Sequence, residues 1–242
     1  MEVPPLDHTQ VHVWTASLST GGTALAELRA VLVAEERARA DCIRAPQLRR
    51  RFIVSRAILR RLLSIYLRVA VSELRLGYGA HGKPYVASVS GLCFNLSHAE
   101  DTVMYAFASQ REVGIDIEST TRDVDIEGVA RQAFSPIECE ALTSLSPDAR
   151  RAAFFRIWTR KEAYVKARGD GLGYPTRTFS VWHLPGGDAT RLADGRQTGS
   201  LAGWQLLEIP APPNFCAALA APGRDWSAMS FDARKLLHLD AC

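Results

Sequence analysis

The spacing of apolar and polar residues predicts most of the secondary structure of this chain. β-Branched residues alternate along 11–15, which favours a strand. Apolar residues at helical spacing predict helices over 23–40 and 47–69, and the polar side of the second helix is crowded with arginines. The same reasoning predicts further helices over 124–133 and 147–167, and further strands over 92–96, 102–108, 113–118, 178–183, 203–208 and 215–220.

Glycine, proline and short polar runs place the turns between these elements. The glycines and the proline of segment 77–84 predict a loop, and the polar run Ser97–Asp101 predicts a turn. Ser135 followed by Pro136 is typical of a helix start, with the serine as the N-cap residue. Gly169 is placed to end the helix before it.

The order of these elements predicts the α+β fold class. Two similar halves, 1–112 and 113–242, are a plausible division, although no internal repeat is visible in the sequence. The most linker-like segment is 185–200, which is rich in glycine and polar residues.

Composition and charge narrow the function classes. The chain has 242 residues, of which 47% are hydrophobic, so it can bury a core without disulfide or metal staples. The net charge of +3 is too small to indicate bulk nucleic-acid binding. The charge is unevenly spread, because arginines crowd between 29 and 75 while acids gather between 101 and 140. The basic first half suggests a polyanionic ligand, such as a nucleotide or its phosphates.

The cysteines indicate a reducing compartment. Their number, five, is odd, and no two have the CxxC spacing of a metal site, so we expect reduced thiols in a cytoplasmic protein. The first residues lack a basic start and a long apolar run, so we expect no signal peptide. No stretch reaches the roughly 18 apolar residues of a membrane span.

The segment VGIDIE (113–118) carries the first candidate chemistry. Alternate residues of a strand share a face, so its apolar residues point into a core while Asp116 and Glu118 share the opposite side. Two carboxylates this close repel each other unless a cation lies between them, and Mg²⁺ accepts such oxygen ligands together with substrate phosphates. For an isolated pair, two ordinary exposed acids are the favoured interpretation.

A second candidate lies in the helix predicted over 147–167. Trp158, Glu162 and Lys166 are four residues apart, so they share one stripe of the helix. Taken alone, Glu162 and Lys166 are best explained as a surface ion pair worth about 0.2–0.5 kcal/mol. The tryptophan on the same stripe indicates a partly covered face, which favours a functional site.

Two shorter signals are weaker. Ser97 and His98 follow a predicted strand and have side chains that donate to phosphate oxygens, although a lone histidine there is more often structural. Pro84 fixes the chain after Lys83 and so aims that lysine, although a loop lysine usually faces water.

These signals occur together with others in a fixed order. The motifs are GKP (82–84), FNLSH (94–98), VGIDIE (113–118), FSPIE (134–138) and WTRKEAYVKARGDGL (158–172). Their combination closely resembles the 4′-phosphopantetheinyl transferases, in particular the larger surfactin-type (Sfp-type) class. The resemblance covers Glu35 to Phe179, and the joint pattern is highly specific although each motif alone is not.

The resemblance implies both an architecture and an activity. It implies two similar α+β halves related by a pseudo-two-fold axis, with the active site at their interface. Such enzymes transfer 4′-phosphopantetheine from coenzyme A to a serine of an apo acyl, peptidyl or aryl carrier protein and release adenosine 3′,5′-bisphosphate. A polyketide, nonribosomal peptide or siderophore synthase would each fit as the source of the carrier. We expect a monomer without nucleic-acid or membrane partners.

Site roles also follow from the resemblance. It implies that Asp116, Glu118 and Glu162 hold Mg²⁺ against the pyrophosphate of coenzyme A, and that Lys166 lies beside this pyrophosphate. Glu162, directly or through a Mg²⁺-bound water, would take the proton of the carrier serine. Lys166 would stabilise or protonate the leaving bisphosphate.

Other residues are assigned to the phosphates and the nucleotide. Ser97 and His98 contact phosphates by this resemblance, and His98 also helps to neutralise charge during transfer. The nucleotide end is expected to meet further residues that are mostly basic, namely Arg39, Arg51, Arg56, Lys83 and Pro84.

Two other functions compete with the transferase. A Mg²⁺-dependent hydrolase of coenzyme A or nucleotide pyrophosphates would use the same acids with water as the nucleophile. A non-enzymatic module would bind RNA or an acidic partner through the arginine-rich helix, but the polar side of that helix lacks an aromatic stacking platform.

Overall fold

Strand β1 (Gln10–Ser17) forms where alternation predicts it and lies inside the first of two sheets. The computed structural model describes residues 3–20, 22–87, 91–181, 193–194 and 203–234. The first sheet has the strand order β11-β1-β5-β4, in which β1 is antiparallel to β5 (Thr102–Ser109) and parallel to β11 (Ser227–Asp232). Strand β4 (Leu92–Ala99) forms the edge nearest the second sheet.

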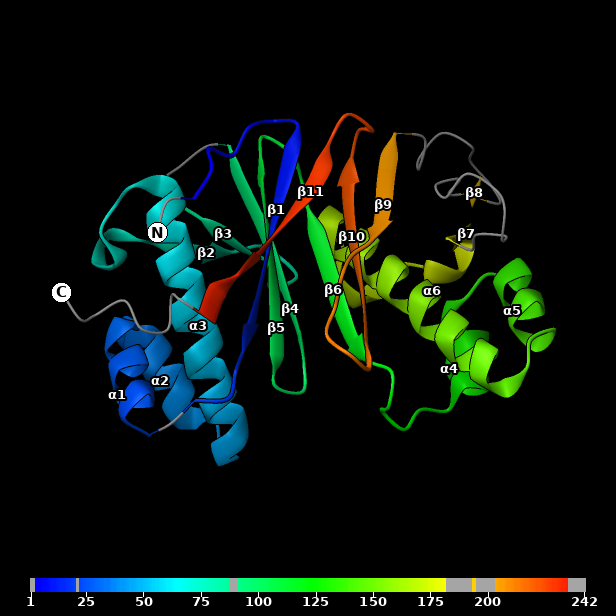
Figure 1. Cartoon of the computed structure of the whole chain (residues 1–242), viewed down its shortest axis with the longest axis horizontal. Helices are drawn as coiled ribbons and strands as arrows, with labels where there is room; N and C mark the ends of the chain where they lie inside the picture. Colours follow the sequence, from blue (N-terminus) through cyan, green and yellow to red (C-terminus); the bar gives the residue numbers. More distant parts are fainter. Residues whose placement is uncertain (1–2, 21, 88–90, 182–192, 195–202, 235–242) are drawn as a thin grey trace.

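The second sheet has the order β6-β10-β9 and is antiparallel throughout. Its strands are β6 (Gly114–Ser119), β9 (Trp204–Glu208) and β10 (Phe215–Pro222). The two sheets lie side by side in the middle of the molecule, with a layer of helices outside each (Figure 1). The observed fold is therefore α+β, as the sequence predicts.

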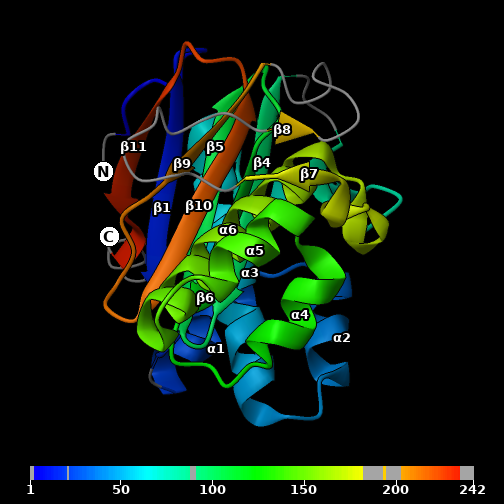
Figure 2. The same cartoon turned by 90° about the vertical axis from the view of Figure 1, so that its right-hand side faces the viewer.

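Each sheet is covered on its outer face by its own helices. Helices α1 (Gly22–Val31), α2 (Ala34–Cys42) and α3 (Pro46–Leu67) lie outside the first sheet. The second sheet carries α4 (Ile126–Ala133), α5 (Pro136–Thr143) and α6 (Pro147–Arg168). Figure 2 shows α6 lying across the face of β6 and β10. The two long helices, α3 and α6, thus occupy equivalent places on the two sheets.

Smaller elements complete the described chain. A two-stranded hairpin is formed by β2 (Leu76–Tyr78) and β3 (Pro84–Val86), and another strand pair by β7 (Phe179–Ser180) and β8 (Ala193–Asp194). Short 3₁₀ turns cover Val71–Glu73, Gly171–Gly173 and Thr176–Thr178.

Strand alternation divides the apolar residues among the layers. On β5, Tyr105 and Phe107 face α3, while Met104 and Ala106 face the second sheet. Val113, directly before β6, and Ile115 and Ile117 of β6 join that central core between the sheets. Asp116 and Glu118 share the opposite side, as the sequence predicts, and the structure shows that this side meets α6. A third core lies between α6 and the second sheet.

Helix α6 is held close to β6 by small residues. Gly114 lies against the backbone of Ala163 and Ala167, and a Cβ atom at this glycine would overlap the carbonyl oxygen of Ala163. The helix ends as predicted at Gly169, whose φ of 75° is the left-handed conformation that favours glycine. This close approach brings the polar stripe of α6 onto the acidic face of β6.

A buried polar network lies in the core between the first sheet and α3. The indole of Trp14 donates to the hydroxyl of Tyr66 at 2.8 Å, and this hydroxyl lies 2.8 Å from Nδ1 of His12. The other ring nitrogen of His12 lies 3.2 Å from the side-chain oxygen of Gln10. Burial lowers the pKa of His12, which has no exposed surface. The network suits a neutral imidazole, with Tyr66 donating to Nδ1 and Nε2 donating to Gln10.

The structure corrects two predicted boundaries in the first half. Ser97 and His98 belong to β4 and not to a turn, because β4 pairs with β5 as far as Ala99 and Thr102, and only residues 100–101 turn. Polar residues occur at the end of β4 because this edge contacts β6, and the local sequence pattern does not reveal that contact. The helix predicted over 23–40 is two helices, and the break falls at Val33, whose N–H donates to Glu36 of the second.

Three other regions also differ from the prediction. The loop predicted over 77–84 contains parts of the β2–β3 hairpin. Strand β11 was not predicted, because its short stretch alternates weakly and is stabilised by parallel pairing with β1. Of the strand predicted over 178–183, only Phe179–Ser180 is a strand, and residues 182–183 lie outside the described residues, as does most of segment 185–200.

The chain passes from the first sheet to the second between β5 and β6, and it returns to the first sheet between β10 and β11. The division at 112/113 falls directly before β6, yet β11 returns from the second half to pair with β1. The pseudo-two-fold relation between the halves stays a prediction. Among the described residues, no helix combines the length and the apolar character that crossing a bilayer requires.

Candidate active site

Side chains bridge the two sheets where the edge of β4 meets the edge of β6. The backbone N–H of Ile115 donates to the side-chain oxygen of Asn95 at 3.0 Å, and both groups are buried. Two residues further along β4, the hydroxyl of Ser97 donates at 2.9 Å to Oδ1 of Asp116, the residue that follows Ile115 in β6. Asn95 thus fixes the register between the sheets, and this register places Ser97 beside Asp116.

Asp116 is the buried centre of this junction. Its residue exposure is only 3%, and Nζ of Lys166 lies 2.6 Å from Oδ1. The same ammonium group donates to the hydroxyl of Ser97 at 2.9 Å. The other oxygen, Oδ2, is buried without a hydrogen-bond partner among the described residues. A buried acceptor of this kind is costly unless a ligand or cation uses it.

Glu118 lies next to Asp116 and is held by two side chains. The indole Nε1 of Trp158 donates to Oε1 at 3.1 Å, and the guanidinium of Arg122 lies 3.5 Å from Oε2. Burial and the nearby charge of Asp116 raise the pKa of Glu118, although Arg122, Trp158 and Lys166 oppose this rise.

Glu162 completes the acidic group from α6. It lies one helical turn after Trp158 and one turn before Lys166, so all these residues face β6. Burial, followed by the charge of Asp116, raises the pKa of Glu162. Lys166 forms its ion pair with Asp116, so the surface pair between Glu162 and Lys166, the simplest sequence interpretation, is not formed. Glu162 and Trp158 also line a pocket of about 320 Å³.

The neighbouring Lys161 has a different role, which the sequence did not reveal. It is 1% exposed and points into the second half, where it pairs with Oε2 of Glu138 at 2.8 Å. It also donates to the carbonyl oxygens of Thr176 at 2.7 Å and Phe179 at 2.6 Å. Glu138 accepts from the N–H and hydroxyl of Ser135, so this pair fixes the helix start that the sequence does predict.

The acids fit a divalent cation in chemistry but do not form a closed cage. In the described part of the chain, no group of three or more His, Cys, Asp or Glu side chains is arranged to hold a metal ion. A cation at this place would nevertheless give Oδ2 of Asp116 a partner and would reduce the mutual repulsion of the three acids. Mg²⁺ commonly uses only one or two carboxylates and takes its other ligands from phosphates and water.

The structure brings one predicted nucleotide residue close to this junction. Lys83, between β2 and β3, pairs with Glu112 at 2.6 Å and donates to the carbonyl oxygen of Ala167 at 2.8 Å. Lys83 therefore lies at the C-terminal end of α6, because Ala167 directly follows Lys166 in the chain. Pro84 begins β3 and is half-buried.

Two further predicted residues lie near the β4–β5 turn. His98 is exposed at the end of β4. Arg51 of α3 pairs with Asp101 of the turn at 2.8 Å. Neither His98 nor Arg51 is bonded to Asp116, Glu118 or Glu162 in the described residues.

Arg39 and Arg56 lie further away, on α2 and α3. Their guanidinium groups lie 5.4 Å and 5.7 Å from the ring centre of Phe52, and Arg56 also packs near Tyr78. Arg56 is held by the buried Glu36, 3.6 Å away. The structure therefore places Arg39 and Arg56 in a cluster that is separate from Asp116, Glu118 and Glu162.

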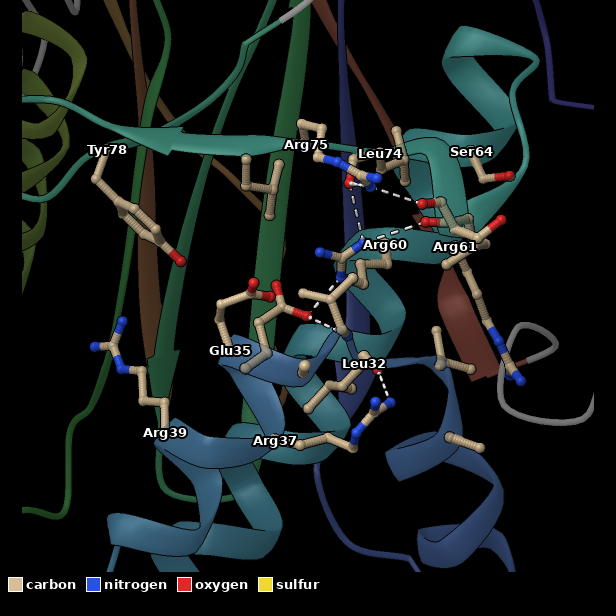
Figure 3. A pocket seen from close by; sticks show the side chains of 18 of the residues that line it. Leu32, Glu35, Arg37, Arg39, Arg60, Arg61, Ser64, Leu74, Arg75 and Tyr78 are labelled. Atoms are coloured by element: carbon tan, nitrogen blue, oxygen red, sulfur yellow. Dashed lines mark hydrogen bonds and ion pairs between the residues drawn. The ribbon is translucent and has the colours of Figure 1, made fainter.

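Arg39 borders a pocket of about 1190 Å³ in the first half (Figure 3). Arg39 and Tyr78 face each other across one end of it. Deeper in, Arg60 is 1% exposed and bonded to Glu36, and Arg37 donates to the carbonyl oxygen of Leu32. Much of the positive charge here is already paired, so the end at Arg39 is the part suited to an anion.

Comparison with known proteins identifies the family. A model of the 4′-phosphopantetheinyl transferase superfamily matches residues 112–219. The 4′-phosphopantetheinyl transferase HetI of Nostoc sp. is 36% identical over 220 residues, which cover 90% of this chain and 90% of HetI. The chain belongs to the 4′-phosphopantetheinyl transferase superfamily.

Other relatives agree with this assignment. The transferase is 32% identical to the 4′-phosphopantetheinyl transferase Sfp of Bacillus subtilis over 68% of its own length and 75% of Sfp. It is 35% identical to AcpT of Escherichia coli K12 over 56% of its length and 66% of AcpT. The alignment with a solved apo-ACPS structure covers 47% of this chain and 98% of the solved chain, at 19% identity and with a TM-score of 0.31.

Proposed function

We propose that this transferase moves 4′-phosphopantetheine from coenzyme A to a serine of an apo acyl or peptidyl carrier protein and releases adenosine 3′,5′-bisphosphate. The observation that carries the proposal is the meeting of Ser97, Asp116 and Lys166 at the junction of the sheets, with Glu162 beside them. Family membership supplies the transferred group, and this junction supplies charges of both signs where a pyrophosphate and a nucleophile must meet.

We propose that Asp116, Glu118 and Glu162 hold Mg²⁺ in the working enzyme. Their hard oxygen donors suit this ion, and the buried, unpartnered Oδ2 of Asp116 is the clearest place for it. When bound, Mg²⁺ neutralises charge on the pyrophosphate during transfer. Lys166 pairs with the other oxygen, Oδ1, of the same aspartate.

The side chains divide the chemistry of the transfer. Glu162 accepts the proton of the carrier serine, and its raised pKa suits a base. The serine oxygen attacks the β-phosphorus, and the bond from this phosphorus to the bridging oxygen breaks, so the electron pair leaves with the bisphosphate. Lys166 neutralises or protonates that leaving group, while Ser97 and His98 contact the phosphates.

The basic cluster is proposed to receive the nucleotide end. Lys83 and Pro84 lie at the end of α6 nearest the acids, and Arg39 lies at the open end of the larger pocket. Arg51 and Arg56 add positive charge on α3. Guanidinium groups suit phosphate oxygens because their donors form a planar fork.

The decisive experiment weighs the carrier. The protein is mixed with coenzyme A, Mg²⁺ and several apo acyl and peptidyl carrier domains, and we expect one phosphopantetheine to be added to a carrier. No mass gain on any carrier would contradict the proposal. A parallel reaction without carrier tests the hydrolase alternative, since only a hydrolase consumes coenzyme A there.

We further propose that the enzyme works as a monomer in the cytoplasm, on carriers of polyketide or nonribosomal peptide synthases. Both sheets that build the junction come from one chain. All four cysteines in the described segments are free thiols, which suits a reducing compartment.

A further inference from the structure

Trp158 differs from the other large aromatic residues of α6 in what its ring contacts. Phe154 and Phe155 are fully buried, whereas Trp158 is half-buried and its indole N–H points at Glu118. The indole ring stacks on Phe154, with ring centres 6.2 Å apart and an angle of 18° between the planes. The residue therefore joins the core of the second half to an acid of the site.

The two donors on Glu118 are unequal. Trp158 contacts Oε1 at 3.1 Å with good hydrogen-bond length, and its position is fixed by α6 and by Phe154. Arg122 faces Oε2 at 3.5 Å, and its side chain is 44% exposed. A cation that approaches Glu118 thus competes with the loosely held Arg122, while the indole continues to hold the other oxygen.

We propose that Trp158 is a positioning residue that orients Glu118 for a divalent cation, and that Arg122 is the counter-ion this cation displaces. This inference rests on the metal ligands of the proposed function. Acid ligands are commonly oriented by hydrogen bonds from residues behind them, whose loss weakens metal affinity by about 10–100-fold. A tryptophan is suited to this role because it donates without carrying a charge that would repel the cation.

The first experiment measures Mn²⁺ binding to the protein–coenzyme A complex without carrier, from the EPR signal of free Mn²⁺. Trp158→Phe keeps the contact with Phe154 but removes the donor, so we expect affinity to fall about 10-fold. Trp204→Phe is the matched control, because Trp204 packs on Tyr164 in the same core, and we expect no change. Arg122→Gln should tighten Mn²⁺ binding, because a competing cation is removed, and an unchanged or weaker affinity overturns the role given to Arg122.

A cycle of variants tests whether Trp158 acts through Glu118. In a Glu118→Gln background, Trp158→Phe should cause little further loss of Mn²⁺ affinity. Equal affinity of Trp158→Phe and wild type, or an equal loss in both backgrounds, overturns the proposal. Wild-type protein that binds no Mn²⁺ overturns it too, while the carrier assay still decides the transferase activity separately.

A spectroscopic measurement covers the case in which Trp158→Phe does not fold. The chain has five tryptophans, so its ¹H–¹⁵N spectrum is expected to show a small set of indole signals. Glu118→Gln should shift the Trp158 indole signal, because its acceptor loses its charge, and leave the Trp204 signal in place. If no indole signal responds to Glu118→Gln, the hydrogen bond is not made in solution and the proposal fails.

Discussion

Replacing Lys161 by methionine should destabilise the fold far more than a change at the adjacent Glu162. Lys161 and Glu138 are both almost fully buried and 2.8 Å apart. Removing one partner leaves Glu138 as an uncompensated buried charge, which costs about 3–5 kcal/mol. The carbonyl oxygens of Thr176 and Phe179 lose a donor as well.

The loss is measured by urea and thermal unfolding. For a chain of this size each kcal/mol lowers Tm by about 2–4 °C, so we expect a decrease of about 6–20 °C. Adding Glu138→Gln to Lys161→Met should recover part of the loss, because the unpaired charge is then gone. A loss below about 1 kcal/mol, the value of an exposed ion pair, would refute the assignment of Lys161 as a buried structural residue.

Three other predictions test the site and the fold. Glu162→Gln should keep the free energy of unfolding within about 0.5 kcal/mol of wild type, yet lower kcat for carrier modification about 10²–10⁴-fold if it is the base; near-normal turnover would exclude that role. Gly114→Ala should cost about 3 kcal/mol or more in urea unfolding, because the new Cβ overlaps the carbonyl oxygen of Ala163 and backbone cannot yield, whereas a neutral result would mean that α6 does not pack this closely on β6. Burial lowers the pKa of His12 in the folded protein, so on acidification the imidazole is protonated more readily in the unfolded chain. The free energy of unfolding should therefore fall as pH drops below about 6.5. Urea unfolding at several pH values should show that His12→Gln flattens this dependence and that His8→Gln, at an exposed residue, does not.

Local periodicity was sufficient for some features of the site. A strand alternates with a period of two, so the sequence determined that Asp116 and Glu118 share a face opposite the apolar residues of β6. A helix repeats every 3.6 residues, so it also determined that Trp158, Glu162 and Lys166 form one stripe. Both predictions are confirmed, because each depends on neighbouring residues only.

The motifs also determined the family, since several weak signals in a fixed order become specific together. The comparison with HetI and Sfp confirms this assignment. The sequence did not reveal that Ser97 lies within a strand, because its polar neighbours are typical of a turn until β6 is placed beside them. It also did not reveal that Lys161, the neighbour of Glu162, is a buried structural residue.

The tertiary structure decided which of these faces meet. Lys166 pairs with Asp116, 50 residues away, and not with its helical neighbour Glu162. Strand β11 joins the first sheet through parallel pairing across almost the whole chain. Such contacts depend on how the layers pack and on which charges are buried together, and neither is encoded in the period of a single segment. The sequence by itself therefore determined the elements, the side each residue takes and the family, whereas the partners of the charged residues came from packing.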